Sequence, residues 1–222
     1  IFTENGLLLK SSVITALAGP LIKGKYVETN TSEILSIGEV SQIMGDVTST
    51  GLDGIQKKLK VGSQVFQSDV IETSGKGSVG IIFIDKTTFS LSDNGRMVLD
   101  ELVYDPSTGT GSMSVDMVEG AFSFISGEIA KTGPGSMEIS TPVATVGIRG
   151  TTVAGRAAIE GNENSFTLLQ DTDGSVGEIS ISNEGGTQIL GQVGATTSLT
   201  SFSIAPPPPV SYTHLRAHET LR

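Results

Sequence analysis

Alternating hydrophobic and polar residues predict β-strands along almost the whole chain. Met113, Val115 and Met117 are separated by single polar residues, which is the period of a strand with one buried face. Similar patterns predict further strands at residues 97–104, 137–148, 165–169, 176–181, 187–190 and 198–204. No long segment has the 3.6-residue period of an amphipathic helix, so we expect little helix.

The segment at residues 78–84 differs from the others because both of its faces are apolar. Val79, Ile81 and Phe83 share one face of the predicted strand. Ile82 and Ile84 share the opposite face. We therefore expect this strand to be covered on both sides, at the centre of the fold.

Turns rich in Asp, Asn, Gly and Pro separate the predicted strands, as at residues 93–95 and 104–107. Gly-Ser pairs open four alternating segments at irregular spacing, beginning at Gly77, Gly111, Gly135 and Gly174. We predict an all-β fold, built as a single twisted β-solenoid-like domain whose coils differ in length. A β-sandwich is the structural alternative, because the pattern of strands does not separate the two.

The composition fits one domain with one sizeable core, since the chain has 222 residues and 37% hydrophobic content. It has no cysteine, which excludes disulfides and thiolate metal sites. The net charge of −10 argues against nucleic acid or an anionic membrane as partner. We expect the short basic run at residues 57–60 to be a solvated turn. No apolar stretch approaches the roughly twenty residues that cross a bilayer, so we expect no membrane insertion by this segment.

We divide the chain into four parts. Residues 1–35 are an N-terminal flanking segment, which we expect to be truncated because it begins at Ile1. Residues 36–204 form the β domain, and residues 205–209 are a Pro-rich linker. Residues 210–222 change abruptly in composition and resemble adapter-derived endings, so we expect a non-native, unpacked tail. Both histidines, His214 and His218, lie in that tail.

Several motifs that suggest chemistry fail on inspection. Residues 75–80 match G-x-G-x-x-G, but a β-branched strand follows them where nucleotide binding needs a helix. Residues 171–174 resemble part of a calcium loop, yet Ser180 stands where the bidentate glutamate belongs. The paired acids Asp69 with Glu72, or Asp100 with Glu101, leave a carboxylate-dependent carbohydrate-active enzyme as a remote alternative. We expect no catalytic residue, no cofactor and no metal site.

The segment TPVATVGIRGT at residues 141–151 closes the alternating region. Gly147 and Gly150 flank Arg149, whose guanidinium has five donors and keeps its charge. We expect Arg149 to be a buried structural pin, held by backbone carbonyls or by a carboxylate such as Asp69 or Asp85.

This segment resembles the signature of FecR-type domains. The order of the preceding segments is also similar to that family: D-x-I-x-T at residues 69–73, an apolar strand and Asp turn at residues 78–85, and further strands at residues 89–91 and 122–127. The resemblance extends over about residues 36–204. The family signature, which we interpret as structural, falls on Asp69, Thr73, Asp85, Thr141, Pro142, Gly147, Arg149, Gly150 and Thr151.

The resemblance implies a non-enzymatic, extracytoplasmic interaction or structural module of a larger secreted or cell-surface protein of a Gram-negative bacterium. Its partner would be another protein or a flanking domain of the same polypeptide. The alternative that the family implies is the periplasmic sensory domain of a transmembrane anti-sigma regulator in iron-uptake signalling.

Overall fold

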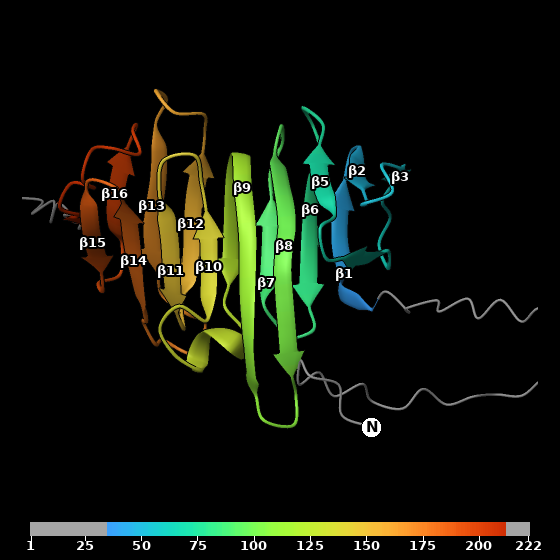
Figure 1. The fold of residues 1–222 in the computed structure, drawn as a ribbon, viewed down its shortest axis with the longest axis horizontal. Helices are drawn as coiled ribbons and strands as arrows, with labels where there is room; N and C mark the ends of the chain where they lie inside the picture. The colour runs from blue at the N-terminus through green and yellow to red at the C-terminus, as the bar shows by residue number, and fades with distance from the viewer. Residues whose placement is uncertain (1–34, 212–222) are drawn as a thin grey trace, which may run out of the picture. The chain divides into compact units, whose positions relative to one another are not determined.

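The computed structural model describes residues 35–211, and these residues form strands joined by tight turns. Seventeen strands are connected in one hydrogen-bonded network, and the long strand β9 (Thr110–Ile125) takes part in two layers of it (Figure 1). The helical structure in this range is one 3₁₀ turn, η1 (Ile129–Lys131). The prediction of an all-β single domain with little helix is therefore confirmed.

Two sheets face each other, and each continues through part of β9. Sheet A contains, in order, β4 (Gln64–Phe66), β1 (Ser36–Met44), β6 (Ser78–Phe83), β7 (Thr88–Leu91), the end of β9, β12 (Thr152–Ala157), β13 (Asn164–Leu169), β16 (Ala195–Leu199) and β17 (Val210–Ser211). Sheet B contains, in order, β3 (Gln56–Lys58), β2 (Val47–Thr50), β5 (Val70–Thr73), β8 (Arg96–Asp105), the start of β9, β10 (Met137–Ser140), β11 (Thr145–Arg149), β14 (Glu178–Asn183) and β15 (Gly186–Leu190).

The direction of pairing departs from that of a regular solenoid. Successive coils of a solenoid stack their strands in parallel, whereas β9 with β10 is the parallel pair among the described strands and the other pairs are antiparallel. The chain instead forms short hairpins alternately in the two layers, such as β10–β11 in sheet B and β12–β13 in sheet A. Two sheets packed face to face correspond to the sandwich alternative.

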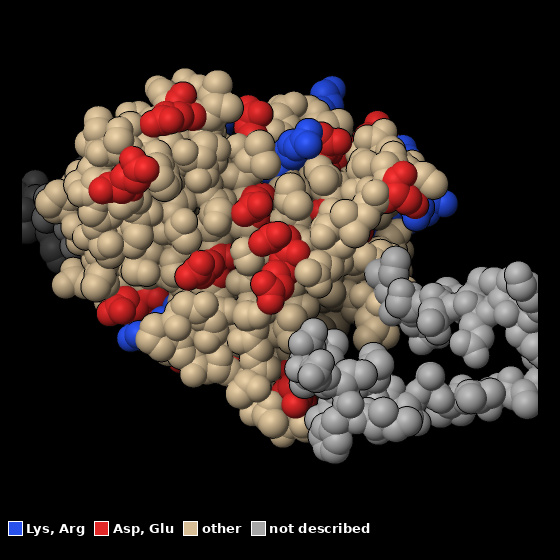
Figure 2. Space-filling view, viewed as in Figure 1, with Lys and Arg blue, Asp and Glu red and all other residues tan. Residues whose placement is uncertain are grey.

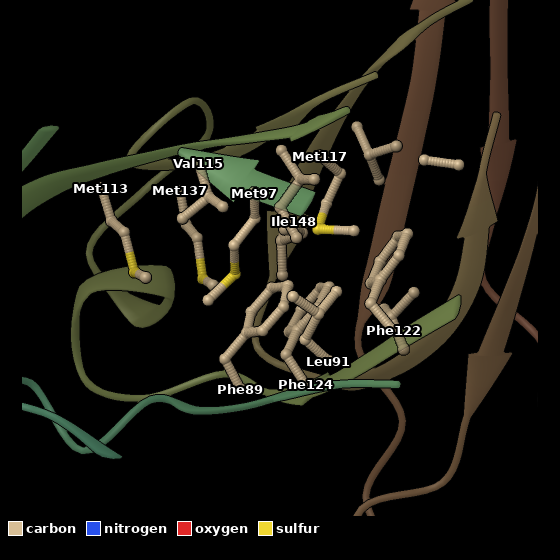
Figure 3. Packing of buried hydrophobic residues seen from close by; sticks show 14 of the residues in the cluster. Phe89, Leu91, Met97, Met113, Val115, Met117, Phe122, Phe124, Met137 and Ile148 are labelled. Atoms are coloured by element: carbon tan, nitrogen blue, oxygen red, sulfur yellow. The ribbon is translucent and has the colours of Figure 1, made fainter. Parts of the chain in front are cut away.

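The core lies between the two sheets. Phe89, Phe122 and Phe124 of sheet A are buried and stack on one another, with ring centroids 5.9 to 6.5 Å apart. Figure 3 shows these rings facing side chains of sheet B, which are Met97, Met113, Val115, Met117, Met137 and Ile148. Each such side chain contributes about 1.5 to 3 kcal/mol when it is removed from water. The predicted inward face of residues 113–117 is confirmed.

The prediction that residues 78–84 are covered on both sides is wrong. Val79, Ile81 and Phe83 are buried between the sheets as expected. Ile82 and Ile84, however, are 46% and 47% exposed. A strand in a two-layer fold meets another sheet on one face only, so the second apolar face of β6 lies at the surface.

Some strand boundaries differ from the predicted ones. Residues 137–148 form two strands, β10 and β11, because a turn at residues 141–144 reverses the chain. Beyond Leu199 the predicted strand at residues 198–204 does not continue. There the chain crosses the β14–β15 turn, where the Asn183 side-chain amide donates to Ile204 O at 2.7 Å. Residues 75–76 form a turn that leads into strand β6, as expected from the turn interpretation of the G-x-G-x-x-G segment.

Both ends of the described region pack more closely than expected. The basic run at residues 57–60 is not a free turn, since residues 56–58 form the exposed strand β3 and Leu59 is buried. The Pro-rich segment lies against β16, because Thr197 Oγ1 donates to Pro207 O at 2.9 Å and Val210 pairs with Thr196. The remainder of the predicted tail, residues 212–222, and the flanking segment up to residue 34 lie outside the described residues. Between residues 35 and 211 we find no helix that could span a membrane.

Candidate functional site

The first signature residues lie at the two ends of β5, where Asp69 fixes the β4–β5 turn and Thr73 fixes the turn between β7 and β8. Asp69 is buried, and its Oδ2 accepts a hydrogen bond from Phe66 N at 3.1 Å in the turn between β4 and β5. Thr73 Oγ1 donates to Ser92 O at 2.5 Å and accepts from Gly95 N at 2.8 Å. The side chains of both residues therefore serve the local backbone, and neither is free to bind a ligand.

Asp85 is fully buried in the turn between β6 and β7. Its carboxylate accepts from Thr87 N at 3.0 Å and from Thr87 Oγ1 at 2.8 Å. It also accepts a longer bond from Ile129 N at 3.4 Å, at the start of η1. Thr87 Oγ1 in turn accepts from Gly127 N at 2.9 Å. This network joins the β6–β7 turn to the segment that leaves β9.

Thr141 and Thr151 hold the two ends of the β11 hairpin region. Thr141 Oγ1 donates to Ala144 O at 2.9 Å and so closes the turn that contains Pro142. Thr151 is fully buried where the chain crosses from sheet B to sheet A. Its N donates to Ser126 Oγ at 2.7 Å, and its Oγ1 donates to Leu169 O at 3.2 Å. These bonds tie the crossing to β9 and β13.

The two glycines of the signature are required for different structural reasons, one for close packing and one for its backbone conformation. Gly147 lies opposite Ser180 on β14, and a Cβ at this position would stand 2.7 Å from Ser180 Oγ. Gly150 has φ of +54°, in the left-handed region that glycine adopts without steric cost. The chain can therefore turn sharply after β11 and enter the other sheet.

The prediction that Arg149 is a buried pin is wrong. Its side chain is 53% exposed, and its Nη1 lies 3.6 Å from Glu178 Oε1 on the neighbouring strand β14. Ile148 occupies the inward position of β11, so alternation directs the next residue to the outer face of sheet B. Neither Asp69 nor Asp85 contacts Arg149, since both carboxylates serve their own turns.

The signature residues do not converge on one pocket. Most of them lie in turns or at the crossing between the layers, where their hydrogen bonds fix how the chain passes from one element to the next. Asp69 and Glu72, which the sequence offered as a catalytic pair, are also engaged separately. Glu72 forms an ion pair with Arg96 on β8 at 3.0 Å, on the outer face of sheet B.

The outer face of sheet B is charged, and Asp and Glu side chains gather over its middle strands (Figure 2). The strands of this sheet carry the acids Glu72, Asp100, Glu101, Asp105, Asp116, Glu119, Glu138 and Glu178. Partial burial, and then repulsion by Asp100, raise the pKa of Asp116, while a hydrogen bond from Ser140 opposes the change. Within residues 35–211, no cluster of His, Cys, Asp or Glu has the arrangement needed to hold a metal ion.

The outer face of sheet A is almost uncharged by comparison. Among all residues of its strands, the charged ones are Glu39 and Arg156. Small or hydroxyl-bearing residues lie opposite one another in one row across the sheet: Gly80, Ser90, Ser123, Ala154, Thr167 and Thr196. The next row contains Ile82, Thr88, Ile125, Thr152 and Leu169, and exposed Glu39 lies at its margin, opposite Ile82 on β1. We call the surface formed by these two rows the neutral face.

Exposed aliphatic side chains distinguish the neutral face. Ile82 and Ile125, on either side of Thr88, are 46% and 43% exposed. Two shallow depressions adjoin them, one of about 410 Å³ that includes Ser90 and Ser123, and one of about 360 Å³ that includes Ile82 and Ile84. Sequence reasoning missed this surface because it placed the second apolar face of β6 in the core. The sequence feature that could have revealed this surface was the second apolar face of the segment, formed by Ile82 and Ile84.

Comparison with known proteins gives one family and a few distant structures. Residues 69–176 match the model of the family described as FecR protein. No curated protein is similar enough to match. A solved structure titled "Cell surface anchoring domain" is 31% identical over 28% of this chain and 82% of that chain, with a TM-score of 0.27. Two crystal structures of a candidate anti-sigma factor from Parabacteroides distasonis are 14% identical over 62% of this chain, with TM-scores of 0.47 and 0.46. The matched region spans 57% of those two chains.

Proposed function

Because residues 69–176 match the FecR family and form a FecR-type domain, we propose that this chain is a non-enzymatic interaction module of a larger bacterial protein. It acts outside the cytoplasm of a Gram-negative bacterium, in a secreted or cell-surface protein. Its partner is another protein or a flanking domain of the same polypeptide. The observation that carries this proposal is the neutral face of sheet A.

The neutral face has the chemistry of a protein contact surface. Ile82 and Ile125 expose apolar area on either side of Thr88 across three paired strands, and apolar exposure grouped in this way marks interaction sites. The hydroxyl row beside them supplies donors and acceptors without the cost of burying charge. Charged residues are generally depleted at the centre of protein interfaces, as they are here.

Other partner classes fit this face less well. A nucleic-acid surface would present basic side chains, but the strands of sheet A carry one cation, Arg156. A carbohydrate site would present aromatic rings, but Phe89, Phe122 and Phe124 of this sheet are buried against sheet B. The alternative of a carboxylate-dependent enzyme is weakened in the same way, because the buried carboxylates are hydrogen-bonded to their own turns.

The sensory alternative uses the same family match. In that case the domain is the periplasmic part of an anti-sigma regulator in iron-uptake signalling, and its partner is a transporter in the outer membrane. The sequence that surrounds this segment in the complete gene separates the two proposals. An upstream apolar helix with a cytoplasmic segment favours the regulator, and downstream extracellular repeats favour the surface protein.

Site-specific photo-crosslinking in the full-length protein tests the neutral face. A photoreactive residue replaces Thr88, between the two isoleucines, and the matched control replaces Ser114 on the outer face of sheet B, separated from β15 by three strands. We expect protein crosslinks from position 88, and we expect the double substitution Ile82→Lys with Ile125→Lys to remove them while the melting temperature is kept. Equal crosslinking from both positions, or none from position 88, would contradict the proposal.

A further inference from the structure

The two sheets end in edge strands that are protected to different degrees. An unprotected edge offers a row of free backbone N–H and C=O groups to any other strand. At one end, β3 has three residues and carries Lys57 and Lys58, and β4 also has three residues. The Asp69 carboxylate additionally binds Phe66 N on β4. Short length and lysine are known means of blocking edge pairing.

At the other end, sheet A is covered by the chain itself. Val210 and Ser211 form β17, which pairs antiparallel with Thr196 and Ala195 of β16. Thr197 Oγ1 binds the preceding Pro207 carbonyl. An extended segment and a Pro-rich run therefore close this edge.

Strand β15, the corresponding edge of sheet B, has none of these protections from Thr187 onward, although residues 204–205 lie against Gly185 in the turn before it. It runs over five residues, Gly186–Leu190, with no charged residue, no proline and no irregularity in its pairing with β14. Ile189 is 52% exposed, and Thr187 is also exposed on the same outer face. Figure 1 shows β15 at the end of its layer, with β14 on one side only.

The hairpin geometry shows which backbone groups of β15 face outward. The turn between β14 and β15 closes through Asn183 and Gly186, with two residues between them. A closing pair of this kind is hydrogen-bonded, and hydrogen-bonded and open pairs then alternate along the hairpin. Thr187 and Ile189 consequently turn both their N–H and C=O groups away from β14. The Gln188 side-chain amide donates to the Ile189 carbonyl at 3.0 Å, an exposed bond that an incoming donor can replace.

We propose that β15 is a docking edge that receives an extended segment of a partner polypeptide, which continues sheet B by one strand. This goes beyond the function proposed above, because the neutral face lies on sheet A. An extended backbone is the ligand that satisfies alternating donors and acceptors at strand spacing. The segment β17 on the neighbouring sheet is an example of such a ligand within this chain.

Charge defines the partner further. Two copies of this chain each carry a net charge of −10, which disfavours pairing of β15 with itself. Exposed Glu184 lies in the turn at one end of β15, whereas Glu178, beside the other end on β14, is already paired with Arg149. The partner segment is therefore uncharged where it pairs and carries Lys or Arg at the flank next to Glu184.

Selection from a random peptide display library on the protein tests the proposal. We expect enriched peptides with an uncharged β-branched centre and a basic flank on the side of Glu184, and we expect them to slow amide exchange at Thr187 and Ile189. Versions of these peptides with N-methyl groups on alternate amides keep the side chains but lose the donors, so they should bind at least about tenfold more weakly. Pairing of β15 with a second copy would appear as dimerisation without any peptide, and it would overturn the identity of the partner.

Two variants locate the binding. Ile189→Pro removes an outward N–H, which an edge strand tolerates, and should abolish peptide binding. If this variant fails to fold, Thr187→Lys with Ile189→Lys places two charges on the edge and should have the same effect. The double substitution Ile82→Lys with Ile125→Lys should leave peptide binding unchanged. Enrichment of no peptide, or binding that survives the β15 variants, would overturn the docking edge while leaving the neutral face untouched.

Discussion

Gly177 packs directly against the backbone carbonyl of Arg149, at the start of β14, so closely that there is no space for a Cβ. The carbonyl of Gly150 lies equally close to the same position. This approach brings β14 beside the end of β11, just before the chain crosses between the sheets. Gly177, which lies outside the family signature, therefore supports the turn at Gly150 between β11 and β12.

The first prediction concerns this contact. Gly177→Ala should destabilise the domain by about 1 to 3 kcal/mol, because the backbone must move to admit the methyl group. Gly191→Ala is the matched control, since no atom lies within 4 Å of a Cβ at that position. Urea denaturation of both variants measures the difference. Equal stability of the two variants would contradict this prediction, because it would mean that the backbone after β11 moves to admit the methyl group without loss of stability.

The second prediction concerns the buried carboxylate of Asp85. Asp85→Ala leaves Thr87 N and Ile129 N without their acceptor, and each lost bond to a charged group costs about 1.5 to 3 kcal/mol. We expect a clear loss of stability and faster amide exchange in η1. Asp105→Ala is the control, because Asp105 makes similar bonds to Ser107 in an exposed turn and should cost much less. A larger effect from the Asp105 variant would contradict the assignment of Asp85 as the structural acid.

A third prediction follows from the raised pKa of Asp116. A carboxyl whose pKa is higher in the folded protein favours folding when it is protonated, and this contribution is lost as the pH rises through the folded pKa. Asp116→Asn should therefore raise the melting temperature at pH 7. The gain should shrink as the pH falls through the raised pKa of the folded protein, and it should be gone below the ordinary aspartate value of about 3.9.

Asp173 serves as a comparison because its pKa is shifted in the opposite direction, downward. Hydrogen bonds from Ser175 lower the pKa of Asp173, so its contribution is present at neutral pH and is lost on acidification. Asp173→Asn should lower the melting temperature slightly at pH 7 and have no effect in acid. Thermal scans of the two variants across pH should diverge in opposite directions. Parallel curves would refute the link between Asp116 burial and stability.

The fourth prediction concerns the ion pair of Arg149 with Glu178. Both side chains are roughly half exposed, and exposed ion pairs contribute about 0 to 1 kcal/mol. Arg149→Ala should therefore be nearly neutral, and a double-mutant cycle with Glu178→Ala should give a small coupling that disappears at high salt. A loss of about 3 to 5 kcal/mol would restore the buried pin that the sequence suggested.

The sequence by itself determined the secondary structure of most of the domain. Strict alternation in residues 113–117 identified the inward face of β9, because successive side chains of a strand point to opposite sides whatever surrounds it. Turn residues such as those at 93–95 and 104–107 marked the breaks, since their backbone preferences are local. The ordered motifs from residue 69 to residue 151 were sufficient to recognise the family.

Only the tertiary structure decided which faces meet another layer. Two residues show where prediction from the sequence failed. Ile82 is apolar and was expected in the core, but it lies at the surface. Arg149 is charged and was expected to be buried, but its side chain is half exposed. Alternation specifies which side chains share a face, but burial depends on whether a second sheet covers that face. In this fold each sheet is covered once, so the outer faces and the free edge at β15 are set by how the chain crosses between the layers.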